Sequence, residues 1–362
     1  MNADSRFAAL RRRMAESKLP ALLVSDIPNV RYVTGFEGVF DDEANVACLL
    51  TLEVARIYTD SRYAEAAGEV AQGTPWIVKS PLENVYVGLC AELGEEEVFH
   101  IAMEASAPYG RFRFVSEQFR GRVEVIDDFV ETQRQVKEAA EVARIAEAAE
   151  ITDRTMEHVL SMLRAGMTEA EVALEAECFM RRNGAESVAF SPIVASGPNS
   201  SRPHATVTDR AIESGDFVVI DIGARVKGYC SDMTRTVVVG TASDRQREMY
   251  ESVLEANELA IAAVRAGIPG SDLDAVARES LAKKGHAAEF SHGLGHGVGL
   301  EVHELPHVSA RGRESLRAGG VVTIEPGVYV PGFGGARIED LVVVEDGGCR
   351  VLTRSPKHLM EL

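Results

Sequence analysis

The chain repeats one pattern of segments, and this repeat limits the folds that it can adopt. Arg164-Ala165-Gly166 recurs as Arg265-Ala266-Gly267, and each copy stands between two stretches with helical spacing of apolar residues. A β-rich segment follows each helix pair, GDFVVIDIG at 215–223 and GGVVTIEPG at 319–327. The period is too long for a solenoid. Two helix–helix–sheet units predict a duplicated domain with a pseudo-twofold axis, and chance similarity of amphipathic segments is the alternative.

Start and stop signals place the second helix of each unit. Thr168 and Glu171 form a capping-box pattern, and the helix that they open ends at Gly184. In the second unit Ser271 is expected to open the matching helix, which ends at Gly285.

The part of the chain before these repeats reads as a separate mixed α/β domain. Composition changes near residue 132, where a long Ala/Glu/Arg-rich helical stretch, Arg134–Leu163, begins. We therefore expect domains at 1–130 and 131–362. The single tryptophan, Trp76, is expected in the core of the first. Expected strands are Ala21–Val24, Ala47–Leu50 and Ile101–Met103, and expected helices are Arg6–Ser17 and Tyr63–Ala71.

Four acids stand at matched positions in the two repeats. Asp221 and Glu325 each end an apolar strand, where an ionised carboxylate is costly unless it is paired or metal-bound. Asp232 and Glu339 each open the next strand, Met233–Val239 or Leu341–Val344. A hairpin in each unit would bring all four acids together, and two divalent ions would balance their charge. The alternative for any one of them is a surface turn cap.

A glycine-rich segment contributes the imidazoles. Residues 292–303 hold three histidines, His292, His296 and His303, among four glycines. Imidazoles can ligate metal or move protons near neutral pH, so this pattern predicts a site. The spacing GxGxxG of a dinucleotide loop is absent. The HExxH match at 303–307 is rejected as a zinc helix because it contains Pro306.

Charge and cysteine content exclude several classes of function. The formal net charge is −18, which disfavours nucleic acid and anionic membranes as partners and favours cations. The five cysteines are widely spaced without a CxxC, which fits a reducing compartment. No leader or membrane-spanning run is evident, so a cytoplasmic location is expected. Neither a GxSxG elbow nor a P-loop occurs.

Taken together, these motifs resemble the Xaa-Pro peptidases, the prolidase and aminopeptidase P branch of the pita-bread metallopeptidases. LLVSDIPNVRYVTGF and YTDSRYAEAA resemble the smaller domain that precedes the catalytic one in that branch. The resemblance implies an α/β (α+β) chain, with a small creatinase/prolidase-like N-terminal domain before a duplicated pita-bread catalytic domain. The catalytic segments that carry the resemblance are VVIDIG, YCSDMTRT, SHGLGHGVGLEVHE, TIEPGVY and ARIEDLVVV.

The resemblance also implies a site with two divalent metal ions per subunit. Asp232 and Glu339 would bridge the ions, Asp221 would complete the shell of one, and His296 and Glu325 that of the other. Four oxygen ligands and one nitrogen favour Mn²⁺, then Co²⁺ or Zn²⁺. The catalytic residues that the resemblance implies are His204, His292, His303, Glu325 and Arg337, with Tyr329 as a weaker candidate.

The implied reaction is hydrolysis of Xaa-Pro bonds, with water activated between the ions. Glu325 is expected to take a proton, His204 and His303 to stabilise the tetrahedral intermediate, and Arg337 to support a ligand carboxylate. A dipeptidase is preferred, and an aminopeptidase acting on longer peptides is the alternative. Many small relatives have arginine where this chain has His307, so a dipeptide's carboxylate would need Arg311, Arg313 or a partner subunit. A homodimer is expected, and a catalytically inactive peptide-binding domain is the least favoured reading.

Overall fold

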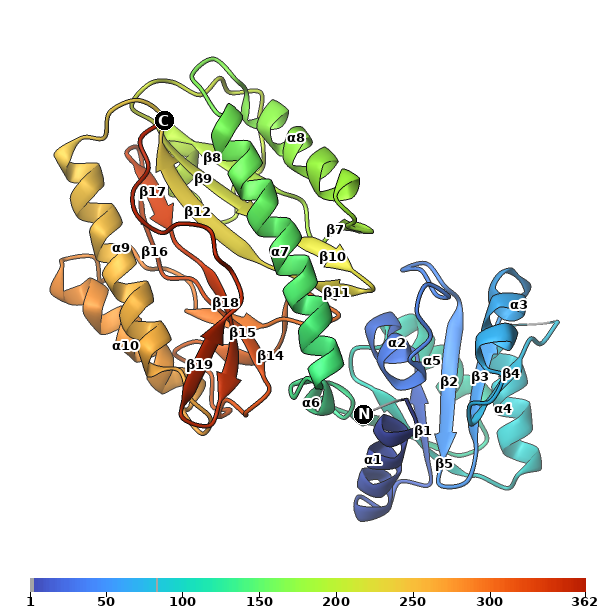
Figure 1. Ribbon diagram of the computed structural model, residues 1–362. Helices are drawn as coiled ribbons and strands as arrows, with labels where there is room; N and C mark the ends of the chain where they lie inside the picture. The colour runs from blue at the N-terminus through green and yellow to red at the C-terminus, as the bar shows by residue number, and fades with distance from the viewer. Residues whose placement is uncertain (1–2, 83) are drawn as a thin grey trace. The chain divides into compact units, whose positions relative to one another are not determined.

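The computed structural model describes residues 3–82 and 84–362 (Figure 1). It divides into two compact units, Met1–Arg134 and Gln135–Leu362. Both units mix helices and strands, which confirms the predicted fold class.

The first unit is built on a six-stranded mixed sheet with the strand order β4-β3-β2-β1-β5-β6. β1 pairs antiparallel with β2 and parallel with β5, and parallel pairing continues to β6. Trp76 is buried in this unit, as its hydrophobic size suggests. The strands are β1 Ala21–Val24, β2 Val46–Thr51, β3 Ala55–Thr59, β4 Trp76–Lys79, β5 His100–Glu104 and β6 Arg122–Ile126. The helices are α1 Ala3–Glu16, α2 Ile27–Thr34, α3 Ser61–Val70, α4 Val85–Glu95, α5 Tyr109–Gln118 and α6 Glu131–Arg134.

The second unit contains the two predicted helix pairs, each followed by strands (Figure 1). Its helices are α7 Ala139–Met162, α8 Glu169–Arg182, α9 Asp244–Ala263 and α10 Gly270–Lys283, with the 3₁₀ helix η1 Gly197–Ser201. The strands of the first repeat are β7 Ser187–Val188, β8 Ile193–Ser196, β9 Phe217–Ile222, β10 Ala224–Val226, β11 Tyr229–Cys230 and β12 Met233–Val238. Those of the second are β13 Gly295–Gly297, β14 Glu304–Val308, β15 Val321–Ile324, β16 Gly327–Val330, β17 Gly334–Arg337, β18 Asp340–Glu345 and β19 Gly348–Val351.

Each repeat contains the predicted long hairpin. In the first, β9 pairs antiparallel with β12, and β10 with β11 extends the hairpin beyond them. In the second, β15 pairs with β18, and β16 with β17 forms the extension. Lys227 and Gly228 both have positive φ, 48° and 80°, as the two central residues of a type I′ turn require.

Two helix boundaries differ from their predictions. The stretch predicted as one helix from Arg134 is interrupted, because the Lys137 amide donates to Gly319 O and α7 starts only after Glu138. Ser271 does not open α10, which begins at Gly270. The first amides of α10 donate instead to carbonyls of the loop at 312–314, so no serine cap is needed.

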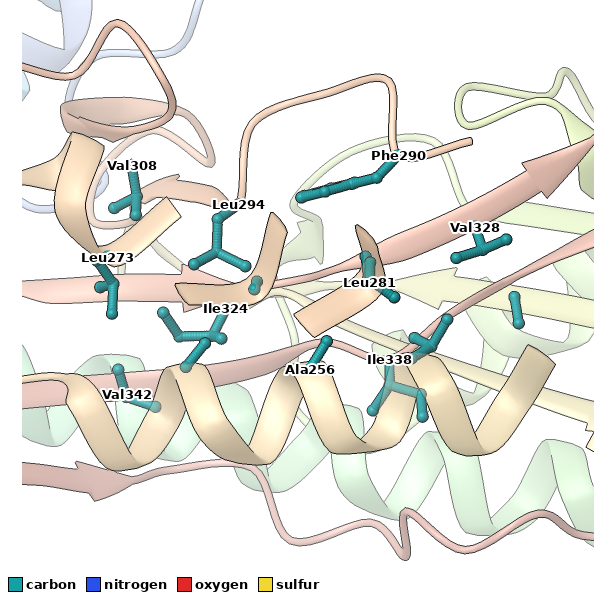
Figure 2. Close-up of a cluster of buried hydrophobic side chains, with 14 of the residues drawn as sticks. Ala256, Leu273, Leu281, Phe290, Leu294, Val308, Ile324, Val328, Ile338 and Val342 are labelled. Carbon is teal, nitrogen blue, oxygen red and sulfur yellow. The ribbon is translucent and has the colours of Figure 1, made fainter. Parts of the chain in front are cut away.

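A separate apolar cluster lies under each helix pair. The first joins α7 and α8 to β9 and β12. The second joins α9 and α10 to β15, β16 and β18, and Figure 2 shows its side chains converging between the helices and strands. Burial of such clusters provides most of the free energy that holds helices on a sheet. The labelled members are Ala256, Leu273, Leu281, Phe290, Leu294, Val308, Ile324, Val328, Ile338 and Val342.

The five cysteines are free thiols, in line with the absence of a predicted disulfide framework. Among the described residues, every helix is too short or too polar to cross a bilayer. The HExxH match at 303–307 falls largely on strand β14, so its rejection as a zinc helix is confirmed.

Candidate metal centre and active site

The hairpins place the four acids at equivalent points. Asp221 lies in β9 opposite Thr234 of β12, and Asp232 directly precedes β12. In the second repeat, Glu325 directly follows β15, and Glu339 directly precedes β18. Pairing continues past Asp221 to Ile222 in the first hairpin and stops before Glu325 in the second, and in both hairpins the two acids lie at the same end of the paired strands.

The imidazole of His296 reaches this group from β13, the strand beside β15. Its Nε2 lies 3.2 Å from Glu325 Oε1 and 3.7 Å from Asp232 Oδ2. One ligand atom each from Asp232, His296 and Glu339 lies within 4.8 Å of the others. The close approach needs glycine at 295, where a Cβ atom would lie 2.0 Å from Thr323 O. The structure therefore brings together acids from both repeats and one imidazole.

Crowding of the acids changes their protonation. Burial, followed by the charge of Glu339, raises the pKa of Asp232 well above its ordinary value. Burial and the charges of Glu325 and Asp221 do the same to the pKa of Glu339. Burial also raises the pKa of Glu325, but its hydrogen bond and ion pair with His296 outweigh this and bring that pKa to about 2. Without a cation, the group cannot be fully ionised at neutral pH.

The donor set fits divalent cations. Oδ1 of Asp221 is buried and has no hydrogen-bond partner, which is costly for a carboxylate oxygen unless a cation meets it. The four carboxylates and His296 together offer mostly oxygen with one nitrogen, a combination suited to hard or borderline ions. The family to which the chain belongs, described below, also implies divalent ions.

Two threonines orient the acids and were missed by the sequence reasoning. Thr234 Oγ1 donates to Glu339 Oε2 at 2.7 Å, across the two repeats. Thr323 Oγ1 donates to Glu325 Oε1 at 3.2 Å and accepts from the His296 amide. Both threonines lie within two positions of a candidate ligand, and this short spacing is the signal that could have indicated them.

Arg337 is buried and all its contacts are with the site. Its Nη2 donates to Asp221 Oδ2 at 2.7 Å, and its Nε donates to Thr234 Oγ1 at 3.0 Å. Its Nη1 donates to Pro203 O and to the Tyr329 hydroxyl. Although burial lowers the pKa of Arg337, the surrounding anionic groups raise it well above the ordinary value, so the guanidinium stays charged. It therefore fixes one oxygen of Asp221 and leaves the other free.

His292 has both ring nitrogens engaged. Nε2 lies 2.9 Å from the Tyr329 hydroxyl, and Nδ1 lies 2.8 Å from Gly293 O. Because Gly293 O can only accept, Nδ1 carries the proton and Nε2 accepts from Tyr329. The loop that carries His292 is held by Arg278, which donates to the carbonyls of residues 290 and 292 and pairs with Asp274.

His303 packs edge-on against His296, with ring centroids 4.2 Å apart. Burial, and then the positive field of His296, lowers the pKa of His303 to about 4. The imidazole is therefore neutral at pH 7 and offers a hydrogen bond rather than a charge.

These residues surround one cavity of about 610 Å³. All five candidate ligands line it, and so do His204, His292, His303 and Arg337. Tyr329 does not line the cavity and is linked to it by its hydrogen bonds with His292 and Arg337. The lining residues Phe190, Ile193, Pro203 and Val302 make part of its wall apolar. Among the described lining residues Arg337 is the only lysine or arginine. The cavity thus combines a group of carboxylates, several imidazoles and an apolar wall.

Comparison with known proteins identifies the family. Residues 143–346 match the model of metallopeptidase family M24, and residues 6–136 match the creatinase/prolidase N-terminal domain. A Xaa-Pro dipeptidase of Pyrococcus horikoshii is 38% identical over 352 residues, which cover 96% of each chain.

Solved structures agree with the sequence comparison. A Xaa-Pro dipeptidase from Bacillus anthracis superimposes with a TM-score of 0.94, at 36% identity and 100% coverage of both chains. An X-Pro aminopeptidase from Thermotoga maritima gives a TM-score of 0.88 at 37% identity, covering 98% of this chain and 99% of that one. The predicted resemblance is confirmed: the chain is a metallopeptidase that belongs to family M24 and, within it, to the branch of the Xaa-Pro peptidases.

Proposed function

We propose that this metallopeptidase hydrolyses Xaa-Pro dipeptides and uses two divalent metal ions per subunit. The observation that carries the proposal is the convergence of four carboxylates and His296 on one cavity, where burial and crowding raise the pKa of Asp232 and Glu339 and bound cations would balance the charge. The names of the relatives in Pyrococcus horikoshii and Bacillus anthracis favour the same substrate class.

In the proposed site, Asp232 and Glu339 would contact both ions, Asp221 would help to hold one of them, and His296 with Glu325 would help to hold the other. Such ions, when bound, polarise the peptide carbonyl and make a water molecule more acidic. The oxygen-rich donor set favours Mn²⁺, with Co²⁺ or Zn²⁺ as alternatives.

Glu325 is the proposed proton acceptor. Its Oε1 is engaged by His296 and Thr323, so Oε2 is the atom assigned to take the proton of the attacking water. A glutamate carboxylate is ordinarily ionised at neutral pH, as a proton acceptor must be. The same group can pass the proton to the leaving nitrogen, which in an Xaa-Pro bond has no hydrogen of its own.

His303 and His204 are the proposed donors to the carbonyl oxygen as it gains negative charge. Both line the cavity, and an imidazole N–H of each can donate a hydrogen bond there. His292 has a different assignment, because both its nitrogens are occupied. We assign it to holding Tyr329 beside Arg337, which in turn orients Asp221.

An aminopeptidase acting on longer peptides is the second candidate, and one observation favours it. A dipeptidase must bind a terminal carboxylate, but Arg337, the lone lysine or arginine among the described lining residues, is already committed to Asp221. Arg311 and Arg313 are not among the described residues that line the cavity. His307 and Ser309 do line it and are polar groups left to meet a terminal carboxylate. The Thermotoga maritima relative carries the name of an aminopeptidase.

The test is hydrolysis of Ala-Pro, Ala-Pro-Ala and Ala-Ala by purified protein that was stripped with chelator and reloaded with Mn²⁺. We expect Ala-Pro to be cleaved fastest and Ala-Ala to be left intact. Equal or faster cleavage of Ala-Pro-Ala would favour the aminopeptidase. No cleavage of either proline peptide with any of the three metals would refute the proposal.

The proposal includes a homodimer in the cytoplasm. Free cysteines and the family resemblance favour these two assignments. Sedimentation velocity of the metal-loaded protein tests the first, with a monomer as the result that contradicts it.

A further inference from the structure

The loop that carries His204 is closed at its base by one buried carboxylate. We propose that Glu169, at the start of α8, is a positioning residue that holds His204 at the rim of the cavity. The inference rests on the proposed role of His204, and its test is arranged so that the two can fail separately.

Glu169 binds the loop on both sides of His204. Its Oε1 accepts from the amide and the hydroxyl of Ser196, each at 2.7 Å. Its Oε2 accepts from the amide of Thr208 at 3.1 Å and from its hydroxyl at 2.6 Å. Asn199 Nδ2 lies between them, 3.1 Å from Oε1 and 3.3 Å from Oε2. One side chain therefore fixes where the loop leaves β8 and where it returns.

A carboxylate suits this place better than any neutral group. Glu169 is completely buried, and all the partners above donate to it. Burial raises its pKa, but the bonds from Thr208, Ser196 and Asn199 outweigh this and lower the pKa overall. Hydrogen bonds to an ionised acceptor are about twice as strong as neutral ones, so the closure is rigid.

The part of the loop around His204 contains no regular structure, since residues 202–210 form no helix or strand. Before it, the Ser200 hydroxyl accepts from the Gly335 amide at 2.9 Å. Between the two ends that Glu169 binds, Pro203 O accepts from Arg337 Nη1 at 3.1 Å. His204 is next to Pro203 and itself has an exposed side chain lining the cavity. The Glu169 closure is therefore one of the contacts that set its position, together with those of Arg337 and Gly335.

Glu171 provides a matched control in the same helical turn. It accepts from the Thr168 amide at 2.8 Å and caps α8, but it makes no contact with the loop. Glu171→Gln removes one carboxylate charge from the same helical turn as Glu169→Gln does, and it leaves the loop contacts intact. We expect Glu171→Gln to keep wild-type kcat.

The first experiment is a double-mutant cycle on the Mn²⁺-loaded enzyme with Glu169→Gln and His204→Ala. The glutamine side chain keeps one accepting oxygen, but its NH₂ group cannot accept from an N–H or O–H, so one side of the loop is released. We expect kcat to fall about tenfold or more in Glu169→Gln, but less than about twofold when the same change is made in His204→Ala. KM and Mn²⁺ affinity are expected to stay within about twofold, because the loop carries no ligand.

The second experiment measures hydrogen exchange, which needs no activity. In Glu169→Gln, amides of 196–208 should exchange faster while those of β9 and β12 stay protected. Thr208→Val removes the 2.6 Å bond to Glu169 and the two longer bonds that the hydroxyl accepts from Asn199 and the Arg210 amide, but it keeps the Thr208 amide bond to Glu169. It should give the same local change in a milder form, and it replaces Glu169→Gln if that variant does not fold. Unchanged exchange in 196–208 would overturn the inference.

The outcomes separate the two claims. His204→Ala with wild-type kcat would refute the proposed role of His204. A low kcat in His204→Ala together with additive effects in the cycle would refute positioning by Glu169 and leave the role of His204 intact.

Discussion

Asp232 is buried and Glu325 is partly buried, and the two lie in opposite electrostatic surroundings. Asp232 is surrounded by other acids, whereas Glu325 has an imidazole against its Oε1. The pKa of the first is therefore raised and that of the second lowered to about 2. In the absence of metal, the acids around Asp232 must share protons, and bound cations would remove that need.

This contrast predicts opposite effects of Asp232→Asn on the metal-free and metal-loaded protein. The substitution replaces an acid whose ionisation its neighbours disfavour with a neutral amide, so the Tm of the chelator-treated protein should rise. The Tm increase on adding Mn²⁺ should shrink or vanish, and turnover should be lost while the protein stays folded. Thermal melting with and without Mn²⁺ measures both. Near-wild-type turnover in this variant would contradict the bridging role, and exposed Asp272→Asn is the control.

Glu104, in the first unit, gives a pH prediction that is independent of the metal site. It accepts from the amides of Ser25 and Asp26 and from Asn29 Nδ2. Burial outweighs these bonds and raises its pKa to about 8. A raised acid pKa means that the folded form prefers the proton. The stability that this preference contributes is complete below the pKa of Glu104 in the unfolded chain. It declines as pH rises toward about 8, and it amounts to a few kcal/mol.

Glu104→Gln should therefore lose part of this pH dependence. The measurement is the free energy of unfolding by urea from pH 5 to pH 9. We expect the variant's stability, relative to wild type, to increase as pH rises through this window. A difference that stays constant with pH would show that Glu104 is ionised throughout.

At the scale of elements, the hairpins were predictable and the contacts between distant elements were not. Alternating or continuous apolar runs around Asp221 and Glu325, with glycine at the turns, specify the paired strands locally. The contact of Glu169 with Ser196 and Thr208 joins residues far apart in the chain, and no local pattern encodes it. The predicted start of α10 was wrong for the same reason. The carbonyls that accept from its first amides belong to the distant loop at 312–314.

A buried ion pair, which the sequence reasoning also missed, anchors strand β14 next to His303. Lys137 Nζ lies 2.6 Å from Glu304 Oε1, and both side chains are almost inaccessible to solvent. Breaking such a pair leaves an uncompensated charge and costs about 3–5 kcal/mol. We expect Lys137→Met to lose that much in urea unfolding.

Pairing Lys137→Met with Glu304→Leu separates the charge from the packing. Removing both charges should restore much of the lost stability, since no buried charge remains. Additive losses in the double variant would contradict this account and assign the effect to packing alone.

For the molecule as a whole, the duplication places the site where the repeats meet. Thr234 of the first repeat binds the side chain of Glu339 in the second, and its carbonyl accepts from the Glu339 amide. Thr236 and Arg337 make a second pair of contacts across the same boundary. Ions held by acids from both repeats would strengthen this boundary, and every candidate ligand belongs to the unit Gln135–Leu362.

Metal removal should therefore act on one unit and spare the other. A ligand that binds the native state at a hundred times its Kd stabilises by about 2.7 kcal/mol. Hydrogen exchange of the full chain, with Mn²⁺ and after chelation, should show lost protection in β9, β12, β15 and β18. Protection in β1 and β5 should not change, as the proposed domains at 1–130 and 131–362 require. Asp232→Asn should show the chelated pattern in both conditions. Equal loss of protection in both units would contradict this independence. It would mean that the charge of the acids destabilises the whole chain, which then opens as one cooperative unit.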